Sequence, residues 1–95
     1  MKVLVSCANG AGTSLMMKMK VQQALKDLNV NVEKIHHCSI SEGKSSAKQF
    51  DVVFCSANFV DMFKDAAAAG VTVIGMKNIL SVDEAKTRMQ EAGLV

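Results

Sequence analysis

The sequence predicts an α/β domain built around a four-stranded parallel sheet, and two observations lead to that fold class. Short apolar segments rich in β-branched residues alternate along the chain with segments that have helical periodicity. The apolar segments are nearly continuous, which is typical of parallel strands covered by helices on both faces. The expected strands are Lys2–Ser6, Val30–Cys38, Asp51–Cys55 and Val71–Gly75.

Three helices are expected between and after these strands. Thr13–Leu28 contains no helix breaker, and its apolar residues recur on one face. Asn58 is expected to cap a second helix, which Gly70 ends. Ser81 and Glu84 form a capping box for the last helix. The expected core faces of the three helices are Met17, Val21, Ala24 and Leu28; Phe59, Phe63 and Ala66; and Val82, Ala85, Met89 and Ala92.

The order of the strands follows from the rules for crossover connections. We expect right-handed crossovers and the flavodoxin-like, Rossmann-like order 2-1-3-4, in a three-layer sandwich. Val30–Cys38 has broken alternation and two histidines, which suits an edge strand. The polar segment Ser39–Gln49 is expected to be a loop with room for a short helix. Ligands of such folds bind where the strand order reverses, here between the carboxyl ends of the first and third strands.

Composition limits the function. A chain of 95 residues predicts one domain, residues 1–95, and an apolar fraction of 49% excludes disorder. The net charge is only +2, and Arg88 is the single arginine, which argues against nucleic acid as a partner. No apolar run approaches the ~20 residues of a membrane span, so we expect no direct membrane insertion. We expect a cytoplasmic protein that starts at its own Met1.

The cysteines and histidines do not have metal-ligand or disulfide spacing. Three cysteines make an odd count, and no CxxC pair occurs, so a disulfide framework and a zinc ribbon are not expected. His36, His37 and Cys38 are adjacent on the expected edge strand, but no second ligand pair accompanies them. We expect Cys55 to end the third strand facing the same crevice as Cys7, in a structural role. We expect neither a metal nor an organic cofactor.

The segment best suited to carry out chemistry directly follows the first strand. It combines a thiol with a loop that can bind an anion. Glycines allow backbone N–H groups to turn inward around an anion, and the N-terminus of the next helix adds free N–H donors. Cys7 stands at the edge of this loop, where a helix N-terminus favours a nucleophilic thiolate. A nucleophilic sulfur beside an oxyanion cradle favours formation of a phosphocysteine. The expected phosphate-binding residues are Ala8, Asn9, Gly10, Ala11, Gly12, Thr13 and Ser14.

The sequence motifs of other known phosphate-binding loops match this segment less well. The dinucleotide fingerprint needs a glycine where Leu15 stands, and the Walker loop ends in G-K-[ST], whereas this loop has Gly12-Thr13-Ser14. Cysteine-dependent phosphatases use C-x5-R-[ST], and Thr13 occupies the position of their arginine. A protein that must pass its phosphoryl group onward is better without an arginine that speeds hydrolysis.

The loop and its surroundings resemble the IIB component of a phosphoenolpyruvate-dependent sugar phosphotransferase system (PTS). The pattern C-x-N-G-x-G-[ST]-S-x-M-M-K-M-K over Cys7–Lys20 is most similar to the ascorbate-type branch of the lactose/cellobiose, galactitol and ascorbate group. The turn Asn78-Ile79-Leu80-Ser81 also resembles that branch. The resemblance implies that Cys7 accepts phosphoryl from a phosphohistidine of IIA and passes it to a sugar, L-ascorbate in this branch, bound in the membrane transporter IIC.

The resemblance also implies a phosphotransferase that associates peripherally with IIC at the inner face of the membrane. Apolar and basic side chains next to Cys7 form an expected docking patch for IIA and IIC: Leu15, Met16, Met19, Lys18 and Lys20. Three alternatives stay open. The first is a IIB component for galactitol or another sugar, the second is an enzyme resembling the low-molecular-weight phosphatases, and the third is a non-catalytic regulatory module of the same fold.

Overall fold

The protein is a three-layer α/β sandwich, as expected. The computed structural model describes residues 1–7 and 11–93. Four parallel strands form one sheet in the order β2-β1-β3-β4, which confirms the predicted 2-1-3-4. The strands are β1 (Lys2–Cys7), β2 (Lys34–Ser39), β3 (Val52–Ser56) and β4 (Thr72–Met76).

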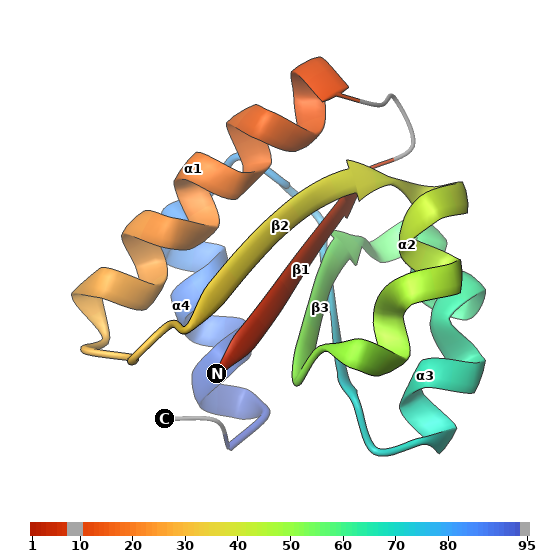
Figure 1. Ribbon diagram of the computed structural model, residues 1–95. Coiled ribbons are helices and arrows are strands. Elements are labelled where there is room, and N and C mark those ends of the chain that lie inside the picture. Colours follow the sequence, from red (N-terminus) through yellow and green to blue (C-terminus); the bar gives the residue numbers. More distant parts are fainter. Residues whose placement is uncertain (8–10, 94–95) are drawn as a thin grey trace.

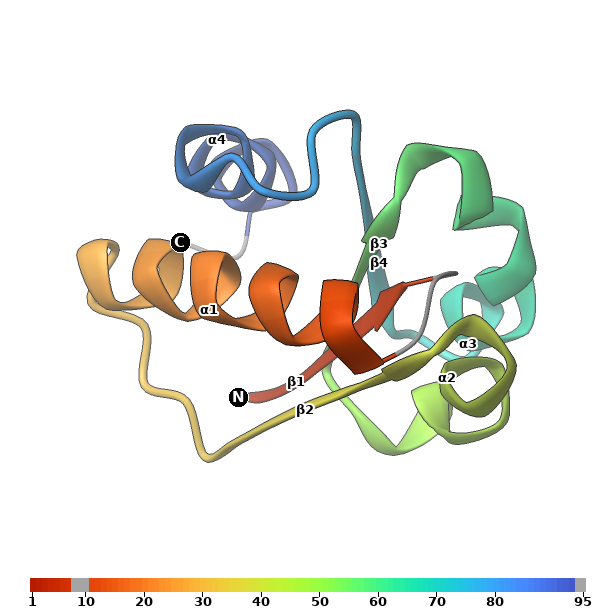
Figure 2. The ribbon, with the colours of Figure 1, turned by 90° about the horizontal axis from the view of Figure 1, so that it is seen from above.

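The helices cover the sheet on both faces. Figures 1 and 2 show α1 and α4 together on one face, with α2 and α3 on the other. The α-helices are α1 (Ala11–Asp27), α2 (Ile40–Ser46), α3 (Lys64–Ala68) and α4 (Val82–Glu91), and 3₁₀ turns span Ala47–Gln49 and Ala57–Phe63. The carboxyl end of β1 and the first turn of α1 lie at the same end of the sheet (Figure 1).

Each face of the sheet has its own apolar cluster. Val3 and Val5 pack into the cluster under α1 and α4, whereas Leu4 packs into the cluster under α2 and α3. Successive side chains of a strand point to opposite faces, so Cys7 lies on the side of Val5 and Ser6 on the side of Leu4. This alternation decides which helices surround each polar residue at the carboxyl end of β1.

Helix α1 begins and ends earlier than the sequence predicts. The expected start at Thr13 moves to Ala11, and the helix ends at Asp27. Asn29 has φ 59°, and the N–H of Val30 donates to the Leu25 carbonyl at 2.9 Å. Together with the hydrogen bond from the Asn29 N–H to the Lys26 carbonyl at 3.1 Å, this bond closes the helix in a Schellman motif. Val30 is therefore part of a helix ending, which is why the expected strand over Val30–Cys38 begins only at Lys34.

Two predictions about helix ends are wrong. Asn58 does not cap a helix: the 3₁₀ segment Ala57–Phe63 begins after Ser56, and no side chain caps it. This segment lies directly on β4, since a Cβ on Gly75 would overlap the Val60 side chain and lie 3.0 Å from the Ala57 Cα. Ala92, expected on the core face of the last helix, is exposed because the helix has ended at Glu91.

Other expected features are confirmed. The segment Ser39–Gln49 contains α2, and the Ser39 Oγ caps it by accepting from the Glu42 N–H at 3.4 Å. Gly70, with φ 99°, follows α3 as its glycine terminator, and the Val71 N–H donates to the Ala66 carbonyl at 3.0 Å.

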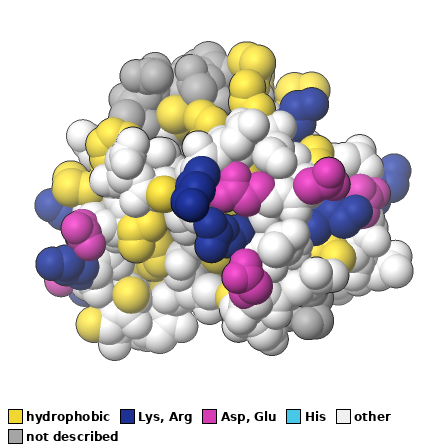
Figure 3. All heavy atoms as spheres, turned by 180° about the vertical axis from the view of Figure 1, so that it is seen from behind, with side chains coloured by type: hydrophobic (Ala, Val, Ile, Leu, Met, Phe, Trp, Pro, Cys, Tyr) yellow, Lys and Arg dark blue, Asp and Glu magenta, His cyan; other side chains and the backbone are white. Residues whose placement is uncertain are grey.

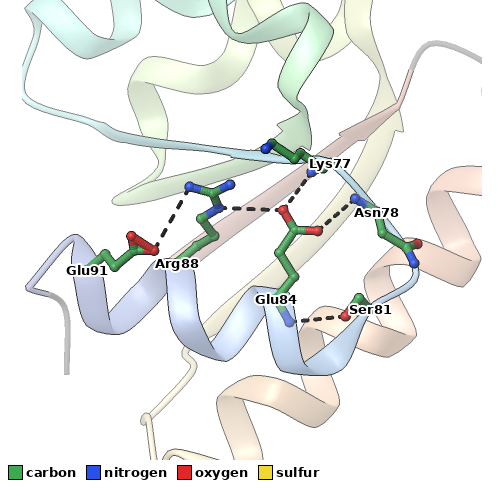
Figure 4. A network of polar contacts seen from close by, with 6 residues as sticks. All are labelled: Lys77, Asn78, Ser81, Glu84, Arg88 and Glu91. Atoms are coloured by element: carbon green, nitrogen blue, oxygen red, sulfur yellow. Dashed lines mark hydrogen bonds and ion pairs between the residues drawn. The ribbon is translucent and has the colours of Figure 1, made fainter.

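The turn before α4 is held by a carboxylate (Figure 4). The Ser81 Oγ accepts from the Glu84 N–H at 3.1 Å, which confirms the capping contact. The Glu84 carboxylate accepts from the backbone N–H groups of Lys77 and Asn78, both at 2.7 Å, and lies 3.5 Å from the Arg88 guanidinium. Burial opposes the charged form, yet these donors outweigh it and hold the pKa of Glu84 below its ordinary value.

Candidate functional site at the carboxyl end of the first strand

Cys7 is the last residue of β1, one position further into the strand than expected. Its side chain is 4% exposed. In the sheet it pairs with Ser39 of β2, the residue that caps α2. The thiol therefore lies where β1 ends, at the end of the sheet from which both α1 and α2 start (Figure 1).

Four of the seven expected phosphate-binding residues, 11–14, belong to α1. Ala8, Asn9 and Gly10 lie outside the described residues, as do the side chains of 11–13. Because α1 begins at Ala11, residues 11–14 form its first turn rather than a loop. The N–H groups of a first helical turn have no partner within the helix, and they carry the positive end of the helix dipole.

Ser14 is held between α1 and the edge strand. Its side chain is fully buried, and its Oγ lies 3.0 Å from Nδ1 of His37 in β2. His37 pairs with Val5 in the sheet, so it lies on the α1 face, which is also the face of Cys7. No role was expected for His37. The signal in the sequence is the alternation of side chains along a strand, which places His37 on the same face as the apolar Ile35, two positions earlier.

The other two thiols belong to the opposite face. Cys55 is fully buried in the cluster under α2 and α3, so the expectation that it faces the crevice of Cys7 is wrong. Burial raises the pKa of Cys55 to about 12. Burial also raises the pKa of Cys38, partly offset by the nearby Ser6 hydroxyl at 4.0 Å. Both thiols are therefore held in the protonated, unreactive form.

Exposed apolar side chains continue from this end of the sheet along α1. Leu15, Met16 and Met19 are 45%, 52% and 60% exposed. Met16 and Met19 also line a groove of about 360 Å³ together with Lys20, Gln23 and Val82 of α4. In Figure 3, which shows the molecule from behind, apolar side chains gather along the upper edge beside basic ones. Of the expected docking residues, Leu15, Met16, Met19 and Lys20 are exposed on α1, and Lys18 is half-buried.

Over residues 1–7 and 11–93, no three His, Cys, Asp or Glu side chains are grouped so that they could hold a metal ion. Among the helices within those same residues, none is both long and apolar enough to cross a bilayer.

Comparison with known proteins identifies the family. Residues 2–91 match the family described as PTS system, Lactose/Cellobiose specific IIB subunit. The chain belongs to this family. Ascorbate-specific PTS system EIIB components of Salmonella choleraesuis and Shigella flexneri are each 31% identical over 80 residues, which are 84% of this chain and 76% of theirs.

The fold of the IIB family is also found in a solved structure. The lactose-specific IIB component domain of the phosphoenolpyruvate:carbohydrate phosphotransferase system from Streptococcus pneumoniae is 19% identical in sequence. It superposes with a TM-score of 0.67, over 99% of this chain and 95% of that one. The flavodoxin-like sandwich is thus shared with a IIB component. IIB components work in phosphotransferase systems together with IIA and IIC.

Proposed function

We propose that Cys7 carries a phosphoryl group between a IIA phosphohistidine and a sugar bound in IIC. The observation that supports this most directly is the separation of the three thiols. All three thiols are buried, but Cys7 ends β1 on the face of α1, whereas Cys38 and Cys55 belong to the opposite cluster, where burial raises their pKa values. Family membership supports the same reaction class.

The proposed reaction consists of two in-line displacements at phosphorus. In the first, the Cys7 thiolate attacks, the S–P bond forms, and the N–P bond of the IIA phosphohistidine breaks with its electron pair left on nitrogen. In the second, the oxygen of a sugar hydroxyl attacks the same phosphorus, the O–P bond forms as the hydroxyl proton passes to water, and the S–P bond breaks with its electron pair left on the Cys7 thiolate. Backbone N–H groups of residues 8–14, with the hydroxyls of Thr13 and Ser14, stabilise the equatorial oxygens.

The proposed substrate is L-ascorbate. The ascorbate-specific relatives support it, at 31% identity. IIC selects the sugar, so galactitol or another sugar is the alternative. Uptake assays with purified IIA and IIC partners and a panel of sugars decide between them: labelled ascorbate entering as its phosphate supports the proposal, and exclusive uptake of another sugar contradicts it.

The proposed docking surface for IIA and IIC is the patch of Leu15, Met16 and Met19 on α1. Methionine adapts to different partner shapes, which suits a carrier that binds two proteins in turn. Lys18 and Lys20 flank the patch and favour acidic partner surfaces. In this proposal the chain works in the cytoplasm and associates peripherally with IIC at the inner face of the membrane.

Phosphorylation followed by mass spectrometry tests the proposal. With phosphoenolpyruvate, the general PTS proteins and the cognate IIA, the wild-type chain should gain one phosphate. Cys7→Ala should gain none, and the control Cys38→Ala should gain one. A phosphate that persists in Cys7→Ala, or that maps to His36 or His37, contradicts the assignment. Steady turnover of p-nitrophenyl phosphate would favour the phosphatase alternative instead.

A further inference from the structure

The turn between β4 and α4, residues 77–81, is largely exposed, yet hydrogen bonds hold its backbone (Figure 4). The Glu84 carboxylate accepts from the first two N–H groups of the turn, both at 2.7 Å. The Leu80 N–H donates to the Asn78 Oδ1, and the Ser81 N–H donates to the Asn78 carbonyl, each at 3.1 Å. The backbone of this turn is therefore fixed before any partner binds.

Two neighbouring apolar side chains of the turn have different environments. Ile79 packs against the core cluster under α1 and α4. Leu80, the next residue, is 38% exposed. A single exposed leucine is ordinary on a protein surface. Leu80 differs in that Ile79 and the hydrogen bonds of the turn hold it in one place.

The turn adjoins the groove that Met16 and Met19 line. Val82 of α4 lines the same groove and follows Leu80 by two positions, which span at most ~7 Å of chain. Leu80 thus continues the exposed apolar surface of α1 from the groove to the turn. This continuity relates Leu80 to the docking surface proposed above.

Positive charge borders the same surface. Lys20 lines the groove and Lys77 begins the turn, and both side chains are exposed. Within residues 1–7 and 11–93, neither lysine forms an ion pair. The Glu84 carboxylate is paired with Arg88, and Asp83 adds one exposed carboxylate in the first turn of α4. The excess of positive charge favours an acidic partner surface.

We propose that Leu80 is a docking residue for IIA and that Glu84 is a positioning residue, which acts by holding the turn. The matching surface of IIA presents an apolar side chain to Leu80 and the groove, and carboxylates to the two lysines. This inference rests on the proposed function, because it takes IIA as the protein that delivers phosphoryl to Cys7.

The occupant is IIA because of the proposed cycle. The chain stays associated with IIC, whereas IIA binds and leaves each time. A surface that is already ordered binds without the entropic cost of ordering it, and lysines at its border increase the association rate of an acidic protein. The methionines of α1 adapt to both partners, but a fixed turn fits one shape.

Met62 provides a matched control. It is 41% exposed, which is close to the value for Leu80. It lies in the 3₁₀ segment Ala57–Phe63, and the adjacent Phe63 belongs to the cluster under α2 and α3. Met62→Ala therefore removes a similarly exposed apolar side chain from the opposite side of the sheet.

Steady-state phosphoryl transfer from phospho-IIA tests the docking role of Leu80. Leu80→Ala should raise the KM for phospho-IIA by roughly five- to thirtyfold, the effect of losing an interface hot spot. The transfer rate at saturating phospho-IIA should stay within about twofold of wild type, because the change affects binding alone. Met62→Ala should leave both quantities near wild type. Transfer from the phosphorylated Leu80→Ala chain to sugar in IIC should be unchanged.

A double-mutant cycle tests whether Glu84 acts through Leu80. Glu84→Gln removes the charge that strengthens the two hydrogen bonds to the turn, and it should raise the KM by roughly two- to tenfold. In the Leu80→Ala background the same substitution should have no further effect. A Glu84→Gln effect of equal size in both backgrounds, with unchanged circular dichroism spectra, overturns the positioning role.

Three results overturn the docking role. They are an unchanged KM for Leu80→Ala, an equal rise for Met62→Ala, and a loss confined to transfer toward IIC, which would make IIC the occupant. Calorimetry with unphosphorylated IIA separates these results from failure of the proposed function. In the Cys7→Ala background, Leu80→Ala should weaken IIA binding by the same five- to thirtyfold. A wild-type chain that gains no phosphate on Cys7 overturns the proposed function, and the calorimetric comparison still decides whether Leu80 binds IIA.

Discussion

Replacing Gly43 by alanine tests how closely α2 packs on the strand that ends in Cys7. Gly43 is a buried residue of α2. A Cβ at this position would overlap the Ser6 Oγ, and it would lie 3.0 Å from the Ser6 Cβ and 3.3 Å from the Cys38 Sγ. The Ser6 hydroxyl has little freedom to move away, because it donates to the Ser39 carbonyl at 2.8 Å.

Whether Gly43→Ala stabilises or destabilises the fold depends on opposing contributions to the free energy of unfolding. Alanine in place of glycine in a helix favours folding by up to ~1 kcal/mol. Overpacking a tight contact costs ~1–3 kcal/mol. Displacing the Ser6 hydroxyl from the Ser39 carbonyl costs a further ~0.5–1.5 kcal/mol. We expect a net loss of about 1–3 kcal/mol in the free energy of unfolding, since the two costs together exceed the helix gain.

Urea denaturation of the wild type, Gly43→Ala, Ser6→Ala and the double variant measures this loss and locates its cause. In the Ser6→Ala background the overlapping oxygen is gone, so Gly43→Ala should cost about 1 kcal/mol less there than in the wild type. Lys44→Ala, an exposed substitution in the same helix, serves as the control and should be nearly neutral. Unchanged or increased stability of Gly43→Ala, or an identical loss in both backgrounds, would refute the packing argument.

Three further predictions concern the turn before α4, the thiols and the docking patch. Glu84→Gln should destabilise the fold by about 1 kcal/mol at pH 7 in urea titrations. Because the folded-state pKa of Glu84 is lowered, the wild-type advantage is present above the ordinary value of 4.5. It should disappear as the pH falls through the folded-state pKa, and a pH-independent difference argues against the carboxylate contacts. Iodoacetamide at pH 8 should modify Cys7 in the native protein and reach Cys55 only after unfolding, as followed by mass spectrometry; the reverse order contradicts the site assignment. Met19→Asp should slow phosphoryl transfer from IIA by roughly five- to thirtyfold with an unchanged circular dichroism spectrum, whereas Gln22→Asp on the same helix should not; equal rates exclude the patch as the docking surface.

Local patterns were sufficient to predict the architecture. Parallel strands with helices on both faces explain why Lys2–Ser6 and Asp51–Cys55 are nearly continuous apolar runs, and both are central strands of the sheet. The histidine-bearing segment was predicted as an edge strand, and β2 is at the edge. The capping contact of Ser81 with Glu84 was also predicted correctly, because both residues belong to the first turn of one helix and the contact depends on no distant residue.

The errors have two origins, a helix ending that extends past the last helical residue and contacts between residues that are distant in sequence. Val30 reads as the start of a strand, but its N–H is used to close α1. The sequence predicts Asn58 to be a helix cap, but the segment around it forms a 3₁₀ turn that packs against β4 at Gly75. The hydrogen bond between Ser14 and His37 joins residues that are 23 positions apart and depends on the register of β1 with β2.

The three cysteines illustrate how a parallel sheet separates one thiol from the others. Cys38 and Cys55 occupy strand positions whose side chains point toward α2 and α3, where apolar neighbours keep the thiol protonated. Cys7 lies on the opposite face, at the last position of its strand, where the chain continues to the first turn of α1. A shift of one residue in the register of β1 would exchange the faces of Ser6 and Cys7 and place the thiol in the apolar cluster.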